Sequence, residues 1–519
     1  MRKDRIIAQQ PTTNRPPLRW PIPAALVVAA SFYRPMVFWA QNAWDLSSPN
    51  KILLIGGAVA IVGLNVVWLL ARLGIDRRAA ALGVATGILI LGDWEKANNV
   101  PIFLKIAVPV IVVWIGNRLS GSTLLDVATV VAVAVFGVAP LIQLVVAHID
   151  QAKPYPLKVL ESAVPAQASG DVEDIVVVIV DSYPNLYVTK EWHGHDTSFI
   201  LDVLSANGFD VPLAAWSQMT FTALSVPSIL ELQPVVGEGP LEPWGNVSSA
   251  NRITRGDSLV TSTLQSAGFT YTHIESGADP LACGDPVDRC AESNWIDEPV
   301  WELLRTTVAA RGMEDNLSFY SVAGTLNAVD NLTRLGNDLI GNGSHDYVFA
   351  HLFLPHPPIV VDSGCEALGG RFPEPANRDL RSDATYLDAF SQQLTCVDGL
   401  IERIADMAQP STAMLITADH GTGFGGQVAR DGRTWTDPDI AERLGILLAY
   451  HLPEGCEPPV DEVNVDVMRA IMSCAVDMEL PIRNPQILLG ADNPFVLDPE
   501  RMADIRAKVE AGTLDRTDG

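Results

Sequence analysis

The sequence predicts an N-terminal α-helical transmembrane bundle of about five spans, followed by an α/β domain with a mostly parallel sheet flanked by helices. Three observations predict this. Residues 1–150 hold nearly all of the long apolar runs of the 519-residue chain. They carry 13 Lys and Arg against 7 Asp and Glu, so a net charge of +6 there leaves −32 for the remainder of a chain whose total is −26. Beyond them, β-branched runs alternate with helical patterns, which is typical of a parallel sheet.

Five apolar stretches define the predicted bundle. A membrane span needs about 20 apolar residues, and the second, fourth and fifth stretches meet this requirement best. The third is short, and the first contains Arg34-Pro35, a pair that is costly in lipid unless it faces protein or water. The stretches are residues 21–41, 52–71, 79–92, 100–116 and 124–147.

Loop charges predict the orientation of these spans. Basic residues gather in the N-terminal tail, after the second stretch and after the fourth, whereas the opposite loops offer Lys51 and Lys96. The positive-inside rule therefore predicts a multi-pass protein of the plasma or inner membrane, with a cytoplasmic N-terminus and an extracytoplasmic chain after residue 148. If one of the five stretches did not cross the membrane, the chain after residue 148 would emerge on the cytoplasmic side instead. The basic residues are Arg2, Lys3, Arg5, Arg15, Arg19, Arg72, Arg77, Arg78 and Arg118.

All six cysteines lie after residue 280, on the side predicted to be extracytoplasmic. An even count confined to one part of the chain favours disulfides in an oxidising compartment, and six free buried thiols are the alternative. Several connectivities are possible, and nearest-neighbour pairing is the expectation: Cys283–Cys290, Cys365–Cys396 and Cys456–Cys474. The strongly acidic composition of this part excludes nucleic acid as a partner, because binding phosphates requires clustered Lys and Arg.

The soluble part divides into a linker, an α/β domain and a tail. Residues 151–172 mix Pro, Ala, Ser and charge, which indicates a linker. The domain is expected over 173–498, and the tail over 499–519 is expected to be a short amphipathic helix with a polar end. Apolar runs predict strands at 174–180, 347–354 and 413–418, and helical periodicity predicts a helix over 384–406.

Each predicted strand is followed by residues that can bind a metal. The first strand ends at Asp181, the second leads to His356, and the third to Asp419 and His420. Open parallel sheets place their sites beyond the carboxyl ends of the strands. An Asp there often caps a turn, and a lone His is often only hydrogen-bonded. Together, these residues predict a divalent metal site, for Zn²⁺ or Mn²⁺, with Mg²⁺ or Ca²⁺ possible.

A hydroxyl-rich segment, SQMTFTALSVPSIL at residues 217–230, lies between the first two of these strands. Thr222 precedes a predicted helix, whose free N–H groups and positive dipole end favour an anion. A nearby metal would lower the pKa of such a hydroxyl further. The alternative is that Thr220, Thr222 or Ser225 serves only as the helix N-cap.

These features together resemble the alkaline phosphatase/sulfatase superfamily. The combination of about five spans with an extracytoplasmic α/β domain resembles its membrane-anchored phosphoethanolamine transferases and lipoteichoic acid synthases. The transferase nucleophile motif T-x-T-A-x-S-V-P is matched at every fixed position by residues 220–227. The resemblance implies that Thr222 is a metal-activated nucleophile that becomes phosphorylated.

The resemblance also implies roles for the other candidates. It assigns Asp181, Thr222, Asp419 and His420 to the metal. His351 and His356 reproduce the H-x-x-x-x-H spacing of the family, so His356 is expected to contact the phosphoryl oxygens or to protonate the leaving group. His351 is expected to be structural.

Departures from the transferase pattern leave the substrate open. The transferases have a further His downstream of the D-H-G sequence, which is residues 419–421 here. This chain lacks that His, and Arg430 or Arg433 is the expected substitute for binding the anion. The cysteines that bracket the nucleophile are also missing, and Asp181 stands where the transferases have Glu. The SVPSI segment approaches the formylglycine motif of sulfatases at Ser225, but Ile229 replaces the required Arg.

The expected function is metal-dependent transfer of a phospho-substituent from a membrane lipid donor to an envelope glycan or lipid acceptor, through a phosphothreonine. A sulfatase-like hydrolase, acting as a phosphodiesterase or sulfuric ester hydrolase, is the first alternative. A non-catalytic partner in envelope assembly is the second.

Overall fold

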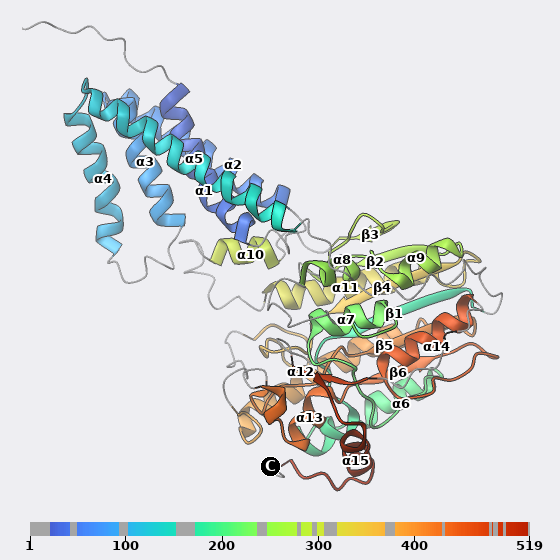
Figure 1. The fold of residues 1–519 in the computed structure, drawn as a ribbon. Coiled ribbons are helices and arrows are strands. Elements are labelled where there is room, and N and C mark those ends of the chain that lie inside the picture. Colours follow the sequence, from blue (N-terminus) through green and yellow to red (C-terminus); the bar gives the residue numbers. More distant parts are fainter. Residues whose placement is uncertain are drawn as a thin grey trace, which may run out of the picture. The chain divides into compact units, whose positions relative to one another are not determined.

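The computed structural model divides the chain into two compact units, a helical unit and an α/β unit (Figure 1). The helical unit comprises Met1–Ala43, Ser48–Asp150 and Leu303–Arg311, and the α/β unit comprises the rest. Most of the predicted linker, residues 152–171, lies outside the described residues, and the domain boundaries expected from the sequence stay predictions. The structure describes residues 21–41, 49–92, 102–151, 172–235, 247–277, 282–292, 298–305, 319–368, 379–427, 431–476, 480, 486–490 and 495–516.

Among the described residues of the first 151, five helices correspond to the five apolar stretches of the sequence. Three of them are long and apolar enough to cross a membrane, at Pro21–Ala40, Pro49–Arg72 and Thr123–Ala147. Helices α3 and α4 have 16 and 17 residues, which at about 1.5 Å per residue is short of a hydrocarbon core about 30 Å thick. The count of about five spans therefore stays a prediction. The helices are α1 (Pro21–Gln41), α2 (Pro49–Arg72), α3 (Arg77–Gly92), α4 (Ile102–Arg118) and α5 (Thr123–Gln151).

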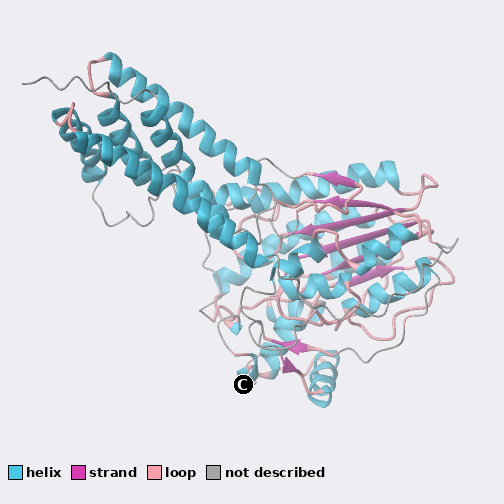
Figure 2. Cartoon of the chain, turned by 45° about the horizontal axis from the view of Figure 1, so that its top comes forward, coloured by secondary structure: helices cyan, strands magenta, loops and turns pink. Residues whose placement is uncertain are grey.

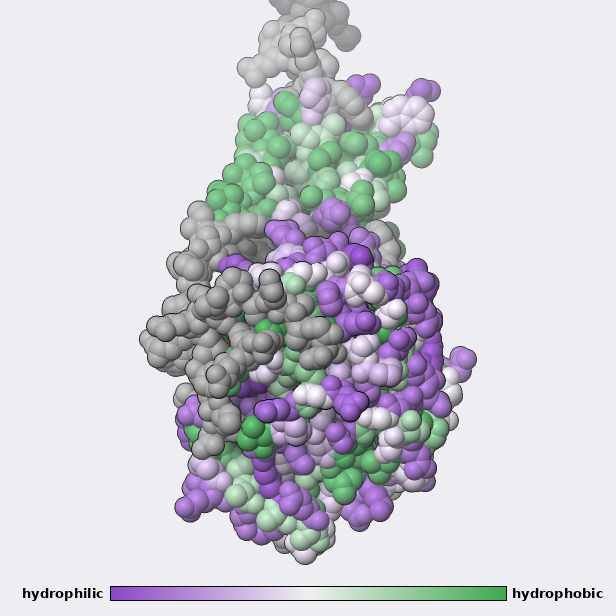
Figure 3. Space-filling model, turned by 90° about the vertical axis from the view of Figure 1, so that its right-hand side faces the viewer, coloured by the Kyte–Doolittle hydropathy of each residue, from purple (hydrophilic) through white to green (hydrophobic). Residues whose placement is uncertain are grey.

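The helical unit exposes apolar side chains. Ile61 and Val62 on α2, Ile106 and Val110 on α4, and Ile142 on α5 are more than half exposed. Figure 3 shows apolar side chains gathered on this unit, whereas the surface of the α/β unit is mostly hydrophilic. Helices that are apolar on the outside as well as the inside are typical of membrane spans.

A six-stranded sheet organises the α/β unit, in the order β3-β2-β4-β1-β5-β6. All neighbouring strands are parallel except β6, which runs antiparallel to β5. Every residue of β1, β4 and β5 is buried, as the continuous apolar runs of the sequence predict for strands covered on both faces. The strands are β1 (Asp174–Val180), β2 (Thr270–Ile274), β3 (Arg289–Ala291), β4 (Asp346–Leu352), β5 (Thr412–Thr417) and β6 (Leu448–His451).

Helices cover both faces of the sheet (Figure 2). One group packs α6 and α11 against α12, and another packs α7 against α8, α9 and α14. The predicted helix over 384–406 is α12, one residue shorter. The α-helices described after residue 172, including those that do not cover the sheet, are α6 (Ser198–Ala206), α7 (Thr222–Leu230), α8 (Val247–Thr254), α9 (Leu259–Ser266), α10 (Glu298–Arg305), α11 (Phe319–Leu339), α12 (Ala384–Ala405), α13 (Asp437–Leu444), α14 (Asn464–Val476) and α15 (Pro499–Glu510).

A second, smaller core joins the C-terminal segment to the α/β unit. Helix α15 buries Met502, Ile505 and Val509 in a cluster that contains Trp216 and Trp435. A two-stranded sheet of β7 (Leu488–Leu489) and β8 (Phe495–Val496) lies beside this cluster. The amphipathic helix expected after residue 498 is therefore a packed element of the fold.

Three disulfides close loops of this unit: Cys283–Cys290, Cys365–Cys396 and Cys456–Cys474. This is the nearest-neighbour pairing expected from the sequence. The second disulfide ties the segment after β4 to α12, and the third ties the segment after β6 to α14. Cross-links of this kind stabilise the fold mainly by restricting the unfolded chain.

Candidate metal and nucleophile site

The register of the three central strands brings their carboxyl ends to one rim. Ile179 of β1 pairs with His351 of β4 on one side and with Thr417 of β5 on the other. Asp181 and Asp419 each lie two residues beyond that level, so they face each other across the ends of adjacent strands. This alignment is the one expected for parallel strands whose sites lie beyond their carboxyl ends.

Asp181 and Asp419 are buried carboxylates with unused oxygens. Their exposed fractions are 2% and 0%, and Asp181 Oδ1 and Asp419 Oδ2 have no hydrogen-bond partner among the described residues. Burial, and then the charge of Asp419, raise the pKa of Asp181 well above its usual value. Burial also acts to raise the pKa of Asp419, but the adjacent His420 and further neighbours outweigh it and lower that pKa to about 2. Two buried carboxylates with free lone pairs are a good fit for a divalent cation.

His420 presents an unprotonated nitrogen to this pair. Its Nδ1 lies 2.9 Å from the Gly421 carbonyl oxygen, which can only accept, so Nδ1 carries the proton and Nε2 is left with a lone pair. Nε2 lies 3.3 Å from Asp419 Oδ2 and 3.9 Å from Asp181 Oδ1. Burial, and then the charge of Arg443, lower the pKa of His420 to about 3. A neutral imidazole held in this tautomer suits a metal ligand.

Thr222 is the first residue of α7, and its hydroxyl reaches the same point. Its Oγ1 lies 3.2 Å from His420 Nε2, and its side chain is half-buried. The N-cap of α7 is Phe221, in extended backbone and without a side-chain cap. The reading of Thr222 as a mere N-cap is therefore wrong, and its oxygen lies at the positive end of the helix dipole.

Two further histidines, His351 near the end of β4 and His356 after it, approach the same carboxylates. Ring nitrogens of His356 and His420 lie within 4.8 Å of each other and of an Asp181 oxygen, and a second group within that range joins His351, Asp181 and Asp419. His351 Nε2 is 3.6 Å from Asp181 Oδ2, and neither of its nitrogens has a hydrogen-bond partner among the described residues. Burial lowers the pKa of His351 to about 4. A buried neutral imidazole with two unused nitrogens is unusual for a purely structural residue.

Ser182 is a site residue that no sequence motif singles out. Its backbone N–H donates to Asp419 Oδ1 at 3.1 Å, and its Oγ lies 3.1 Å from His420 Nδ1. It has φ of 61°, a left-handed conformation that is costly for a residue other than glycine and that concentrates at functional sites. The contact partners are more than 230 positions away, so no local pattern could have shown this role.

Arg443 of α13 is a second residue that sequence reasoning missed. Its buried guanidinium donates to the Thr220 carbonyl at 2.8 Å and to the Gly421 carbonyl at 3.1 Å. It also lies over the Phe221 ring, at 5.1 Å from the centroid. Burial lowers its pKa to about 10, although nearby carboxylates oppose this. Arg443 thus joins the segment before Thr222 to the segment after His420.

Of the two arginines expected to bind the anion, the structure describes only Arg433. Arg430 lies outside the described residues. Arg433 is exposed, pairs with Asp431 at 3.4 Å, and places its guanidinium 5.0 Å from the Phe495 ring centroid. Among its described contacts, none reaches Thr222 or His420, so its substrate-binding role stays a prediction.

The three serines of the 217–230 segment are buried and hydrogen-bonded inside the protein. Ser217 Oγ donates to the Asp419 carbonyl oxygen and lies 3.1 Å from Ser225 Oγ. Ser225 is 1% exposed, which leaves its side chain no access to a substrate. Ser228 Oγ donates to the Leu224 carbonyl oxygen inside α7. Thr222 is therefore better placed than Ser225 to act as a nucleophile.

The donor set fits a divalent transition metal. Carboxylate oxygens and neutral imidazole nitrogens converge within 4.8 Å, and several of these atoms lack any other partner among the described residues. That combination suits Zn²⁺ or Mn²⁺. The side chains of Glu275, Cys283 and Cys290 also converge within 4.8 Å, but the two cysteines form a disulfide and offer no thiolate.

No protein-family model and no curated protein matches the chain. Several solved structures are similar to it. The integral membrane lipooligosaccharide phosphoethanolamine transferase A of Neisseria meningitidis has a TM-score of 0.39 and 11% identity, over 87% of this chain and 95% of that chain. The C-terminal periplasmic domain of EcEptC of Escherichia coli has a TM-score of 0.38 and 13% identity, over 61% of this chain and 86% of that chain.

A third similar structure is the lipoteichoic acid synthase LtaP of Listeria monocytogenes, with a TM-score of 0.35 and 11% identity, over 63% of this chain and 76% of that chain. These proteins belong to the classes that the sequence motifs resemble. At such identities and TM-scores, the likeness carries no activity over to this chain, whose function has to be argued from its own site.

Proposed function

We propose that the chain is a membrane-anchored, metal-dependent enzyme that transfers a phospho-substituent from a lipid to an envelope acceptor through a phosphothreonine at Thr222. One observation supports this above all. A half-buried hydroxyl lies 3.2 Å from His420 Nε2, beside the buried and partly unpartnered carboxylates of Asp181 and Asp419. Such an arrangement can activate a hydroxyl that a substrate is still able to reach.

We assign metal binding, nucleophilic attack and proton donation to different residues of the rim. A divalent cation held by Asp181, Asp419 and His420 would supply the positive charge that lowers the pKa of the hydroxyl and stabilises phosphoryl oxygens. Thr222 Oγ1 gives its proton to water and attacks the phosphorus of a lipid phosphodiester, and the bond from phosphorus to the lipid alcohol breaks. His356 is the group that we assign to protonate the departing alkoxide.

The second half of the reaction regenerates the threonine. An acceptor hydroxyl attacks the phosphorus of the phosphothreonine and gives its proton to His356, the Thr222 Oγ1–phosphorus bond breaks, and Thr222 Oγ1 takes a proton from water. With water as acceptor, the same site would be a phosphodiesterase. Apolar helices that anchor the enzyme beside lipid donors raise their local concentration, which favours a lipid phosphodiester as the first substrate.

Intact mass spectrometry of the purified full chain tests the nucleophile. After incubation with a phospholipid mixture and Mn²⁺ or Zn²⁺, we expect a mass increase equal to a phospho-substituent, mapped to Thr222 by fragmentation. The Thr222→Ala variant should show no adduct and no turnover while still binding metal through the remaining donors. Thr222→Ser keeps a hydroxyl and should retain partial activity. Full activity in Thr222→Ala would contradict the proposal that Thr222 is the nucleophile.

Substrate panels separate the transferase from the hydrolase. Release of the lipid alcohol that depends on an added acceptor alcohol supports transfer, whereas release at the same rate in water alone supports hydrolysis. Arylsulfates and bis-aryl phosphates should be compared directly. Because Ser225 is buried, we expect the phosphate esters to be cleaved and the sulfates not, and preferential cleavage of the arylsulfate would favour the sulfatase alternative.

A further inference from the structure

Two helices of the helical unit end in the same tryptophan–arginine pair. Helix α2 ends in WLLAR and α4 in WIGNR, so Arg follows Trp by four residues in both. The Arg72 guanidinium lies 4.5 Å from the centroid of the Trp68 ring, and that of Arg118 lies 5.5 Å from Trp114. Both tryptophans are about half exposed, at 49% and 60%. Tryptophan and arginine at the end of an apolar helix mark the level of lipid headgroups.

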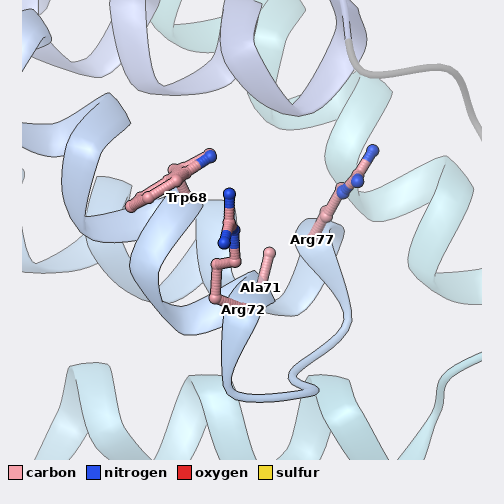
Figure 4. A pocket seen from close by; sticks show the side chains of 4 residues that line it. All are labelled: Trp68, Ala71, Arg72 and Arg77. Carbon is pink, nitrogen blue, oxygen red and sulfur yellow. The ribbon is translucent and has the colours of Figure 1, made fainter.

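The α2 pair differs from the α4 pair because a cavity of about 330 Å³ lies beside it. Its lining consists of Trp68, Ala71, Arg72 and Arg77. Figure 4 shows the Trp68 and Arg72 side chains together on α2 and the Arg77 side chain on the far side of the turn, bordering the same space. The cavity therefore has an aromatic wall and two guanidinium groups.

The acidic residue of the turn is neutralised by other groups. The Asp76 carboxylate accepts three hydrogen bonds from Arg78, one of them from Nη2 to Oδ2 at 2.7 Å. The Asp76 backbone N–H donates to Asn117 Oδ1 at 2.9 Å. Arg78 also binds Asp126 of α5 at 2.6 Å. These contacts fix the turn between α2 and α3 and pair Asp76 with Arg78. The charged residues that line the cavity are Arg72 and Arg77.

From this geometry, we propose that the cavity binds the phosphate of a membrane phospholipid headgroup. Arginine guanidinium groups match phosphate oxygens in charge and geometry. The volume falls at the lower end of the range for small-molecule sites. Leu69 and Leu73, at 53% and 71% exposed, continue the apolar surface of α2 beside it and can contact acyl chains. Basic pockets at the ends of transmembrane helices are a recurrent type of lipid headgroup site.

This site is independent of Thr222, because all of its residues belong to α2, α3 and the turn between them. Loop charges predict that this end of the unit faces the cytoplasm, where anionic lipids are concentrated. A bound phospholipid would act as a structural anchor for the turn. Free inorganic phosphate shares the charge but lacks the acyl chains that would contact α2.

Native mass spectrometry of the full chain in detergent, titrated with phosphatidylglycerol, tests the proposal. We expect the double variant Arg72→Gln/Arg77→Gln to bind the lipid about 30-fold more weakly, since each arginine near a lipid phosphate contributes roughly a fivefold factor. Arg118→Gln is the matched control, because it removes the same kind of tryptophan–arginine pair away from the cavity. It should change the affinity less than about twofold.

A single variant, the control variant and competition with phosphate also test the proposal. If the double variant fails to fold, Arg72→Gln alone should weaken lipid binding about fivefold. Wild-type affinity in either arginine variant, or an equal loss in Arg118→Gln, would overturn the proposal. Inorganic phosphate at the same concentration should not displace the lipid, and displacement would show that the site recognises free phosphate instead.

Discussion

Thr222 differs from its neighbouring hydroxyl residues in exposure rather than in chemistry. The side chains of Ser217, Thr220 and Ser225 are buried from solvent, whereas that of Thr222 is half-buried beside His420 Nε2. Composition alone offers five similar candidates, and the motif at 220–227 selects one of them. The structure adds a physical reason, because a nucleophile has to combine an activating environment with access to substrate.

Ser182 provides a prediction at the residue scale. Its Oγ helps to hold His420 in place, and residues that orient a metal ligand typically contribute a factor of about 10–100 in metal affinity or activity. We therefore expect Ser182→Ala and Ser182→Gly to weaken Zn²⁺ or Mn²⁺ binding by roughly that factor, as measured by competition with a calibrated chelator.

Comparison of Ser182→Ala with Ser182→Gly separates the effect of losing the hydroxyl from the effect of backbone strain. Glycine accepts the left-handed φ of residue 182 without strain, so Ser182→Gly should be more stable than Ser182→Ala by about 0.5–1 kcal/mol. If only Ser182→Ala lost metal affinity, backbone strain rather than the hydroxyl would be the cause. Equal affinity in all three proteins would contradict the role assigned to Ser182.

At the scale of elements, α13 clamps the two segments that carry Thr222 and His420. Arg443 reaches the carbonyls of Thr220 and Gly421. The preceding residue, Glu442, is fully buried and accepts from the backbone N–H groups of Phe424 and Gly425 in the loop after D-H-G. Burial acts to raise the pKa of Glu442, but its contacts with His193 and Arg381 outweigh this and lower the pKa to about 2.

Arg443→Lys is expected to lower kcat by about 10–100-fold with a smaller change in KM, because one ammonium cannot span both carbonyls and small displacements of reacting groups are costly. The matched control is Arg501→Lys on α15, whose guanidinium donates to the Trp435 carbonyl and to Asp437 away from the rim. That control should lower the unfolding temperature without changing kcat. Unchanged kcat in Arg443→Lys would show that α13 does not position the site.

Glu231, at the C-terminal end of α7, links that helix to α9. Its Oε1 accepts from the Leu259 N–H at 3.0 Å, and burial raises its pKa to about 7. The folded state therefore holds a proton that the unfolded state has lost above about pH 4.5. This contribution to stability is complete below that pH and disappears as the pH rises through 7.

Glu231→Gln keeps an acceptor for Leu259 but removes the titration. Between pH 5 and pH 8, wild type should lose about 2 kcal/mol of unfolding free energy more than the variant does. Unfolding midpoints of both proteins across this range measure the difference. Parallel pH profiles would contradict a raised pKa at Glu231.

The accuracy of the predicted elements depends on the length of their sequence patterns. The strands predicted at 174–180, 347–354 and 413–418 lie within two residues of β1, β4 and β5, because a long continuous apolar run is typical of a strand buried on both faces. Strands β2 and β3 span only five and three residues, too few for a periodic signal. Likewise, the sequence predicts candidate ligands at strand ends. It could not show Ser182 or Arg443, because their contacts with Asp419 and Thr220 join segments more than 200 residues apart.

At the scale of the whole molecule, the rim joins β1, β4, β5 and α7 around two buried carboxylates. Without a cation, Asp181 and Asp419 oppose each other, and burial and that repulsion raise the pKa of Asp181. A cation that binds only the folded state would relieve this and stabilise the fold by about 3–4 kcal/mol at 100–1,000 times its Kd. Under the proposed function, the rim would be both a reaction site and a point at which metal binding couples to folding.

Metal removal tests this coupling. Protein stripped with a chelator should unfold several degrees lower than protein reloaded with Zn²⁺ or Mn²⁺, with smaller effects of Mg²⁺ and Ca²⁺ because imidazole ligands favour transition metals. Asp181→Asn should abolish the metal-dependent gain, yet its metal-free form should be no less stable than metal-free wild type, because the amide removes the carboxylate repulsion. Identical unfolding of stripped and reloaded wild-type protein would show that the rim holds no stabilising cation. A large loss in metal-free Asp181→Asn would show instead that Asp181 is a structural residue.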